Sequence, residues 1–423
     1  MTVKEAVEYI DNYTWSTSKL GLERTTELLE KMGNPQDSLR FVHVTGSNGK
    51  GSTCVMTESV LRAAGYKTGL FTSPYVCDFN ERIQVNRVNI SDEELADITG
   101  YVASFADAME DHPTQFELIT AIGMEYFKRC GCEIVVLEVG MGGAMDSTNV
   151  IKNPEVCAFT NIGLEHTEYL GNTLREIATT KGGIIKAGAT VVCYDGEPEV
   201  NEVLLKISKD KGNKCIFASG DNIESLPVTI DGQRFTYKGS EYDIGLLGRH
   251  QLYNASVAIE ITEALRDRGF AISEEALKRG LENAVWPARF EILRREPLFI
   301  LDGGHNPQCA EALADTLKDV LKDVNGGKAI FLTGTLKDKD YHKIAETISA
   351  YAEKLVIVTP DNPRALPAKS YAEVFTNMGI EASACDSVAA GVTEVLKTSG
   401  NKPVVAFGSL YMAGEIRRLV LNR

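Results

Sequence analysis

The sequence predicts an α/β protein with mainly parallel sheets, divided into two domains. Short apolar runs alternate with amphipathic stretches of helical spacing along most of the chain, which is the pattern of repeated strand–helix units. The 423 residues exceed what one hydrophobic core usually holds. The alternation pauses at Trp286-Pro287-Ala288 and restarts at Leu298. We therefore predict a first domain over residues 1–290 and a smaller second domain over residues 291–423.

In the first domain, apolar residues spaced three and four apart predict helices, and short apolar or alternating runs predict strands. The predicted helices span residues 3–13, 20–32, 50–64, 91–110, 115–129, 173–186, 250–268 and 273–283. The predicted strands span residues 41–44, 82–90, 134–137, 156–160 and 190–193, and a further strand ends at 70–71. Asp231-Gly232 and Lys238-Gly239 predict hairpins within residues 229–242.

The second domain is predicted to be a Rossmann-like α/β unit, because its strand–helix pattern repeats without interruption. Strands are expected at residues 298–301, 329–332, 355–358 and 404–407, each followed by a helix. A second domain of this kind behind a first commonly forms a cleft for ligands.

Composition and charge exclude several classes of function. The net charge is −15 and the sequence contains no dense run of Lys or Arg, so we expect no nucleic-acid partner. No apolar run is long enough to span a bilayer, and the first residues lack the apolar core of a secretory signal. The nine scattered cysteines favour buried, reduced thiols. We therefore expect a cytoplasmic monomer with no membrane partner.

The strand at residues 41–44 runs into Thr45-Gly46-Ser47-Asn48-Gly49-Lys50-Gly51-Ser52-Thr53, after which a helix begins. Glycines let the backbone approach phosphate oxygens, and free N–H groups at a helix start favour anions. Lys50 would meet the β- and γ-phosphates, and Ser52 or Thr53 could reach Mg²⁺. Val44 replaces the first glycine of the GxxxxGK[ST] pattern, and Gly51 follows the lysine. A turn that only packs a helix on a sheet is the alternative, but the context favours a P-loop NTPase-like domain that binds ATP through Gly46 to Ser52.

This loop is similar to the nucleotide loop of the folylpolyglutamate synthase and dihydrofolate synthase family, which belongs to the Mur ligases. The family usually has Thr at the position of Ser47. Further motifs of the family follow in its order, so the resemblance covers essentially the whole chain. It implies an ATP-dependent ligase that adds L-glutamate to folate, or to dihydropteroate, with two Mg²⁺ ions.

Glu138 ends the apolar strand at residues 134–137, at the sheet edge that also carries the phosphate loop. A carboxylate there suits Mg²⁺ or caps a neighbouring loop, and the strand alone does not decide between these roles. The segment LEVGMGG resembles the family's LEVGLGG, which implies that Glu138 binds Mg²⁺. Thr72-Ser73-Pro74-Tyr75 resembles TSPH, which implies that Ser73 binds the same ion, although Tyr75 replaces the family's His.

Gly163-Leu164-Glu165-His166, with Leu170-Gly171 after it, resembles the family's GLDHxxxLG and implies that His166 binds a second Mg²⁺. Lys181 lies in TTKGGII, where the family has EKAGII and a carbamylated lysine that binds metal. Carbamylation requires a lowered lysine pKa in a partly buried site. A structural histidine and a solvated helix lysine are the alternatives.

The resemblance also assigns residues from the second half of the nucleotide site. Gly248-Arg249-His250-Gln251-Leu252-Tyr253-Asn254 resembles G-x-H-Q-x-x-N, so Asn254 would contact adenine. WPARFE resembles WPGRFE, so Arg289 would meet the phosphates. Asp302-Gly303-Gly304-His305-Asn306-Pro307 resembles DGAHNP, which places Asp302 on the nucleotide and His305 at the reacting groups. Lys50, Lys181 and His305 are therefore the predicted catalytic residues.

Three residues are implied to hold the incoming glutamate. Arg82 lies in FNERI, which matches the family, and a guanidinium suits a carboxylate. Ser409 and Tyr411 lie in GSLY, which also matches. A surface charge at a strand edge is the alternative role for Arg82.

The implied reaction has two steps. The γ-phosphoryl group of ATP passes to a carboxylate of the folate, and the amine of L-glutamate then displaces phosphate from the acyl phosphate. A Mur ligase that acts on a cell-wall nucleotide peptide is one alternative, but we expect no room for its additional N-terminal domain ahead of Thr45. A non-catalytic ATP-binding protein is another, against which the candidate ligands for two metal ions argue.

Overall fold

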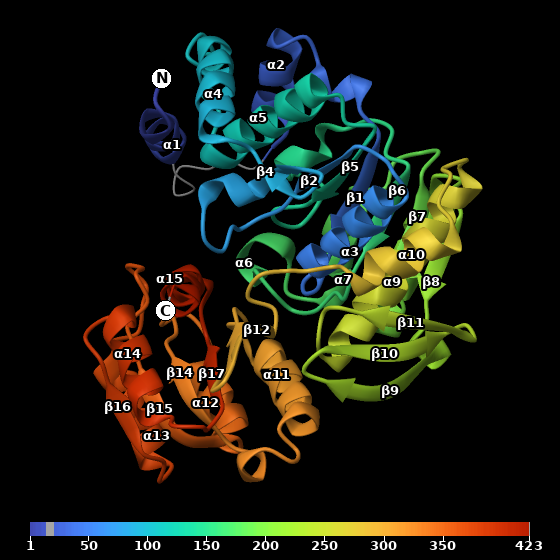
Figure 1. Cartoon of the computed structure of the whole chain (residues 1–423). Helices are drawn as coiled ribbons and strands as arrows, with labels where there is room; N and C mark the ends of the chain where they lie inside the picture. The colour runs from blue at the N-terminus through green and yellow to red at the C-terminus, as the bar shows by residue number, and fades with distance from the viewer. Residues whose placement is uncertain (14–20, 423) are drawn as a thin grey trace.

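The structure is a computed structural model that describes residues 1–13 and 21–422. Its elements form one large sheet, a small antiparallel sheet and a second parallel sheet (Figure 1). The predicted helix at residues 20–32 begins outside the described residues. Where the structure describes it, the helix is α2 (Glu23–Lys31).

The large sheet has eight strands in the order β4-β3-β2-β5-β1-β6-β7-β8. Their bounds are Phe41–Thr45 (β1), Thr68–Phe71 (β2), Ile83–Val85 (β3), Val88–Asn89 (β4), Ile134–Glu138 (β5), Val156–Phe159 (β6), Thr190–Tyr194 (β7) and Cys215–Ala218 (β8). All neighbours are parallel except the β2–β3 and β3–β4 pairs. The mainly parallel sheet predicted from the sequence is confirmed.

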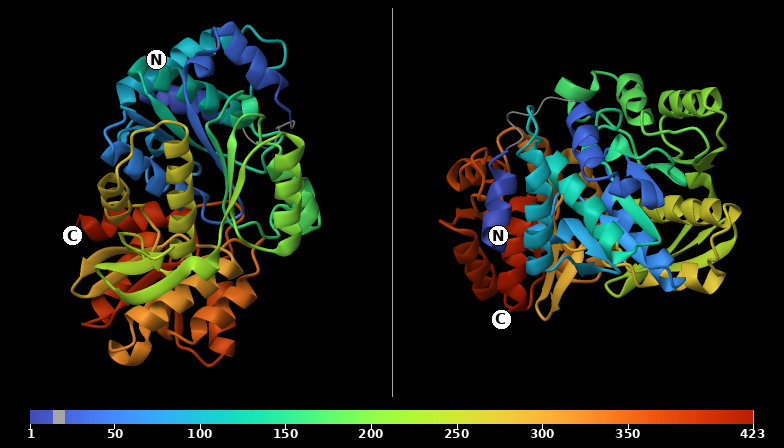
Figure 2. Two further views of the ribbon diagram at one scale, coloured as in Figure 1. Left: turned by 90° about the vertical axis from the view of Figure 1, so that its right-hand side faces the viewer. Right: turned by 90° about the horizontal axis from the view of Figure 1, so that it is seen from above.

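Helices cover both faces of this sheet (Figure 2). One core joins Val42 and Val44 to α3 (Lys50–Ala63), α9 (Arg249–Asp267) and α10 (Glu274–Glu282). On the other face, Phe41 joins the core of α2 and the helices α1 (Val3–Asp11), α4 (Asp92–Ala106) and α5 (Gln115–Cys130). Alternate residues of β1 therefore serve opposite layers, as expected of a strand buried on both sides.

The strand β8 and two helices beside the sheet were not predicted. These helices are α6 (Thr167–Leu170) and α8 (Pro198–Asp210), which follow β6 and β7. The signal for α8 was present, because Pro198 opens the helix and Val200, Val203 and Leu204 have helical spacing. The predicted helix over residues 173–186 is shorter, at Leu174–Gly182 (α7).

The predicted hairpins are confirmed as a three-stranded antiparallel sheet. Its strands are Ile223–Thr229 (β9), Gly232–Tyr237 (β10) and Ser240–Ile244 (β11). Phe235 and Tyr237 of β10 are buried in the core that contains α9, so this small sheet extends the first core.

The last sheet has six strands in the order β12-β13-β17-β14-β15-β16, and only β12 is antiparallel. The strands are Glu291–Arg295 (β12), Leu298–Asp302 (β13), Ala329–Thr333 (β14), Ala352–Ile357 (β15), Ala382–Ala384 (β16) and Val404–Phe407 (β17). The helices are Pro307–Val320 (α11), Tyr341–Ser349 (α12), Ala368–Asn377 (α13), Val388–Thr398 (α14) and Leu410–Leu421 (α15). The four predicted strands are confirmed, whereas the edge strands β12 and β16 lack the apolar runs that announce a strand.

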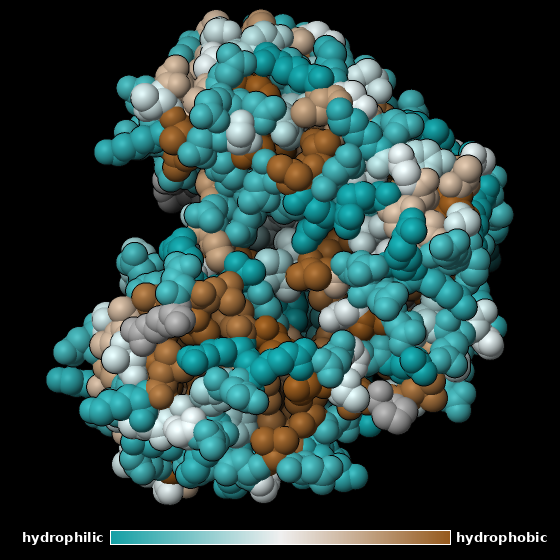
Figure 3. All heavy atoms as spheres, viewed as in Figure 1, coloured by the Kyte–Doolittle hydropathy of each residue, from teal (hydrophilic) through white to brown (hydrophobic). Residues whose placement is uncertain are grey.

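The two large sheets present their carboxyl ends to a hollow that crosses one face of the molecule (Figure 3). Loops that carry predicted site residues follow β1, β2, β5, β6, β13 and β17. Parallel α/β sheets bind ligands at this edge. No helix in the described part of the chain is both long and apolar enough to cross a membrane. All nine cysteines are described, and each is free.

Candidate active site

The phosphate loop turns tightly between β1 and α3. Gly46 and Gly49 have φ angles of 154° and 89°, a region that favours glycine. A Cβ atom at Gly46 would lie 1.9 Å from Thr160 Oγ1, and one at Gly49 would lie 2.2 Å from Asn254 Oδ1. Both positions therefore require glycine for space as well as for backbone conformation. Asn254 lies against the loop, as the predicted nucleotide site requires.

Lys50 is the first residue of α3, and its ammonium group folds back over the loop. Its Nζ donates to the carbonyl oxygens of Gly46 at 2.9 Å and of Ser47 at 3.2 Å. The amides of Ser47 and Asn48 donate to the carbonyl oxygen of Asn161 at 2.7 and 3.4 Å, which ties the loop to the segment after β6. The ammonium group of Lys50 thus lies against the loop, where it could contact phosphate oxygens.

Glu138 ends β5 beside the phosphate loop and is buried. The amide of Ser73 donates to Glu138 Oε2 at 3.0 Å. Burial raises the pKa of Glu138 to about 7, although the charges of Lys50, Arg289 and Arg82 act in the opposite direction. Glu138 and Ser73, predicted as ligands of one metal ion, are therefore in contact.

Lys181 is 1% exposed and lies in the last turn of α7. Its Nζ donates to Glu165 Oε1 at 2.8 Å and to the Gly46 carbonyl oxygen at 2.9 Å. Burial and the charge of Lys50 lower the pKa of Lys181 to about 8. Lys181 is not the solvated helix lysine of the alternative reading. His166 caps the start of α6 in a left-handed conformation with φ of 45°, and its side chain is exposed.

Arg82 lies near Glu138, on the side of the loop that carries Ser73. Its Nη1 donates to Ser73 Oγ at 2.8 Å, and its guanidinium carbon lies 5.1 Å from the ring centre of Tyr75 and 5.6 Å from that of Phe79. The buried Nε has no hydrogen-bond partner among the described residues. Burial lowers the pKa of Arg82. An inward-facing arginine of this kind contrasts with the strand-edge surface charge considered as its alternative.

The strand β13 ends in Asp302, whose carboxylate accepts hydrogen bonds from the backbone around it. Its Oδ2 accepts from the Phe290 amide at 2.9 Å, and its Oδ1 accepts from the Gly304 amide at 2.7 Å. His305 lies next in the loop, and its Nδ1 is 3.3 Å from the Gly303 carbonyl oxygen. Burial and the nearby charge of Lys339 lower the pKa of His305 to about 4, so its imidazole is neutral at neutral pH.

The C-terminal helix α15 begins beside the loop that carries Ser73. Ser409 caps this helix by accepting from the Tyr411 amide at 3.2 Å, and Tyr411 is 53% exposed. Further along the helix, a Cβ atom at Gly414 would lie 2.2 Å from the Val76 carbonyl oxygen, so the helix packs directly on this loop. Residues from both ends of the chain therefore meet near Arg82.

Comparison with known proteins matches almost the whole chain to two family models and to full-length relatives. Residues 44–262 match the model of the Mur ligase middle domain, and residues 288–410 match the model of the Mur ligase glutamate ligase domain. The folylpolyglutamate synthase of Lacticaseibacillus casei is 33% identical, over 100% of this chain and 99% of the relative. The dihydrofolate synthase/folylpolyglutamate synthase of Bacillus subtilis is 35% identical, over 97% of this chain and 98% of the relative.

This chain belongs to the folylpolyglutamate synthase and dihydrofolate synthase family of ATP-dependent Mur ligases.

Solved structures agree with this assignment. The apo form of the L. casei folylpolyglutamate synthase superposes with a TM-score of 0.88 at 31% identity and covers 100% of both chains. A complex of a folylpolyglutamate synthase with AMPPCP and folate superposes with a TM-score of 0.85, also at 31% identity and with full coverage of both chains. The α/β fold of this ligase is thus that of the family.

The sequence did not predict a direct contact between the phosphate loop and α11 of this ligase. Asn48 Nδ2 donates to Gln308 Oε1 at 2.6 Å, and Asn306 Nδ2 donates to Asn48 Oδ1 at 3.4 Å. Asn306 also caps α11 by accepting from the Cys309 amide at 2.8 Å. The residues are about 260 positions apart in the chain, so no local pattern could have paired them.

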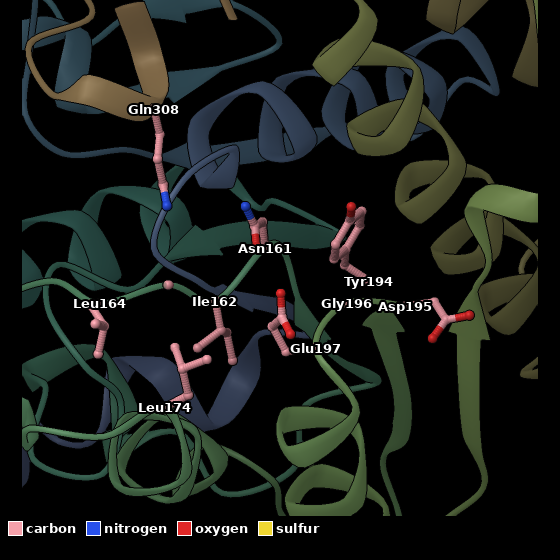
Figure 4. A pocket seen from close by; sticks show the side chains of 10 residues that line it. Asn161, Ile162, Leu164, Leu174, Tyr194, Asp195, Gly196, Glu197 and Gln308 are labelled. Carbon is pink, nitrogen blue, oxygen red and sulfur yellow. The ribbon is translucent and has the colours of Figure 1, made fainter. Parts of the chain in front are cut away.

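A pocket of about 560 Å³ lies beside this contact and was also not predicted (Figure 4). Gln308 reaches in from α11 on one side. On the other side lie Tyr194, the last residue of β7, and Asp195, which follows it. Its remaining lining residues are Asn161, Ile162, Gly163, Leu164, Leu174, Gly196 and Glu197. The turn residues Asp195-Gly196 were the available sign that a loop ends β7 at this edge.

Proposed function

We propose that this ligase joins L-glutamate to a carboxylate of folate through an acyl phosphate, with ATP as co-substrate. The observation that carries the proposal is the convergence of Lys50, Glu138 and Arg82 at one sheet edge, in a chain of this family. Phosphoryl transfer needs charge neutralisation and alignment, which Lys50 and Arg289 would supply. Asn254 and Asp302 would hold the nucleoside part of ATP. His305, held neutral, would lie at the reacting groups.

The residues predicted to hold Mg²⁺ fit a hard cation unequally. Glu138 offers a buried carboxylate, and Ser73, whose amide donates to it, would add a hydroxyl group. The described residues contain no group of three or more His, Cys, Asp or Glu side chains that could hold a metal ion. A second ion at His166 would therefore depend on Lys181. Bound Mg²⁺ would neutralise the phosphate charge during transfer.

Carbamylation would convert Lys181 from a cation into a ligand. The neutral amine would attack CO₂, forming an N–C bond and releasing one proton, and a carboxylate would result. The lowered pKa of Lys181, about 8, makes part of the amine neutral at physiological pH. Burial protects the product from solvent.

For the glutamate substrate we propose Arg82, Ser409 and Tyr411. The unpartnered Nε of Arg82 is a donor for a carboxylate, and the aromatic rings of Tyr75 and Phe79 hold the guanidinium in place. Tyr411 is exposed at the start of α15, beside the same loop. The glutamate amine would then face the acyl phosphate.

We further propose that the chain divides into domains at residues 1–290 and 291–423, and that it works as a cytoplasmic monomer. Family models that end at residue 262 and begin at residue 288 support a boundary in this region. The antiparallel strand β12 begins the last sheet at Glu291. Substrates bound from both sides would be enclosed when the domains close, which would exclude water from the acyl phosphate.

The test is glutamate-dependent release of phosphate from ATP, measured in parallel with tetrahydrofolate and with dihydropteroate. Activity with tetrahydrofolate supports the proposal, and activity with dihydropteroate adds the dihydrofolate synthase reaction. Lys50→Ala should abolish turnover and keep the thermal unfolding temperature. If ATP binds but neither pterin substrate is used, a Mur-type ligase for another carboxylate or a non-catalytic ATP-binding protein takes its place.

A further inference from the structure

The segment that joins α10 to β12 contacts the phosphate loop through the side chain of Trp286. Trp286 is 7% exposed and belongs to the core of α3, α9 and α10. A Cβ atom built at Gly51 would lie 3.1 Å from the indole Nε1 and Cζ2 atoms and 3.2 Å from Cε2. These distances are shorter than ordinary van der Waals contacts, so the indole would have to move by a few tenths of an ångström to admit a side chain at position 51.

This packing explains why the loop departs from the common phosphate-loop pattern. That pattern has Ser or Thr after the lysine, with a hydroxyl group on Mg²⁺. Here Gly51 takes the position, although glycine inside a helix is unfavourable by about 1 kcal/mol relative to alanine. Since Gly51 lies in the first turn of α3 and has no positive φ angle, its backbone does not require glycine. The neighbouring indole, which an added Cβ atom would approach to 3.1 Å, disfavours a side chain there.

Arg87, in the turn between β3 and β4, also contacts this segment. Its Nη2 donates to the Val285 carbonyl oxygen at 2.6 Å, and its guanidinium carbon lies 6.0 Å from the Trp286 ring. Its Nε lies 4.0 Å from Glu58, a buried carboxylate of α3. The indole Nε1 has no hydrogen-bond partner among the described residues, so packing fixes the ring.

Three residues after Trp286 the segment presents Arg289. The carbonyl oxygen of Ala288 accepts from the Gly303 amide at 2.8 Å and from Arg289 Nη1 at 3.0 Å. The segment thus packs on α3 through Trp286 and is hydrogen-bonded to the residue after β13 through Ala288. The position of Arg289 relative to Lys50 depends on both attachments.

We propose that Trp286 is a positioning residue for ATP binding, which sets Arg289 against the phosphate loop and requires glycine at position 51. The inference rests on the proposed binding of ATP at this loop. In this proposal the indole contacts the loop and does not contact the nucleotide. A ring of similar shape should therefore retain part of the effect.

The test is a double-mutant cycle on Gly51 and Trp286, with the dissociation constant of AMPPCP in Mg²⁺ measured by calorimetry. Gly51→Ala should weaken binding about tenfold in the wild-type chain but less than twofold in a Trp286→Ala background, since the Cβ atom then finds space. Gly100→Ala is the matched control, because that helical glycine of α4 has no atom within 4 Å of an added Cβ. It should leave the dissociation constant unchanged.

Intrinsic fluorescence supplies a readout that loss of stability alone would not reproduce. The chain has two tryptophans, so the emission of Trp15→Phe comes from Trp286 alone, and AMPPCP should change it. Trp286→Phe should bind AMPPCP more tightly than Trp286→Ala. Equal losses from Gly51→Ala in both backgrounds, or an emission of Trp15→Phe that AMPPCP leaves unchanged, would overturn the inference. If the wild type itself does not bind AMPPCP, the proposed function fails as well.

Discussion

Two buried ionisable groups flank the phosphate loop, and they differ in the direction of their pKa shifts and in their ion pairing. Glu138 ends β5 on one side of β1, has a raised pKa and forms no ion pair within the described residues. Lys181 lies beyond β6 on the other side, has a lowered pKa and is paired with Glu165. The carboxylate at the first position could bind a cation as it stands, whereas the amine at the second would first need a chemical change.

The two groups also give stability opposite dependences on pH. With its pKa raised from 4.5 to about 7, Glu138 binds a proton more tightly in the folded than in the unfolded chain, so stability is lost as the pH rises through that range. With its pKa lowered from 10.5 to about 8, Lys181 binds a proton less tightly when folded, so stability is gained as the pH rises through that range. Around neutral pH both charged forms are unfavourable, and a bound cation or carbamylation would relieve each.

The largest expected effect is on catalysis at the Glu138 position. Glu138→Gln should lower kcat by about 10²–10³, because the buried carboxylate that would hold Mg²⁺ is lost. Steady-state phosphate release measures this effect, with the exposed Glu168→Gln on α6 as the control. Turnover within tenfold of the wild type would remove Glu138 from the reaction.

A somewhat smaller loss is expected at the Lys181 position. Lys181→Met should lower kcat by about 10²-fold, since neither an amine nor a carbamate remains. In the wild type, depletion of CO₂ should lower turnover and bicarbonate should restore it, more fully when preincubation is moved from about pH 7 to pH 9. Mass spectrometry of the intact protein would detect the added carboxyl group. If turnover does not depend on CO₂, Lys181 acts as a structural ammonium group and not as a carbamate.

The third prediction separates function from stability. In the absence of Mg²⁺, Glu138→Gln should be more stable than the wild type at about pH 8, by on the order of 3 kcal/mol at most, and little different near pH 4.5. Urea unfolding at the two pH values measures the difference. Mg²⁺ with AMPPCP should stabilise the wild type more than the variant. A variant less stable than the wild type at both pH values would contradict the cost assigned to the buried charge.

The smallest effect is expected for Glu165→Asp, which introduces the residue that the family usually has. The shorter carboxylate can still neutralise Lys181, so turnover should stay within about threefold of the wild type. Glu165→Gln removes the charge and should lower turnover further, because Lys181 loses its ion pair. Equal turnover in both variants would show that the pair does not matter.

The sequence predicted those parts of the site that are local. The phosphate loop, the carboxylate of Glu138 and the loop at Ser73 each follow a strand, and apolar runs locate the strands. Because carboxyl ends of neighbouring parallel strands share an edge, such residues converge once the sheet forms. The edge strands β12 and β16 were missed because they carry little apolar signal, whereas the apolar run Cys215–Ala218 of β8 was a signal that the prediction did not use.

Residue types in their order therefore determined the α/β class, the parallel sheets, the phosphate loop and the family. Only the tertiary structure decided which partner each side chain received: Glu165 for Lys181, Gln308 for Asn48 and the Gly51 gap for Trp286. Hydrogen bonds within a loop and the alternation along a strand depend on neighbours in the chain. Contacts between loops depend on how helices and sheets pack, and that packing brings together residues separated by many positions.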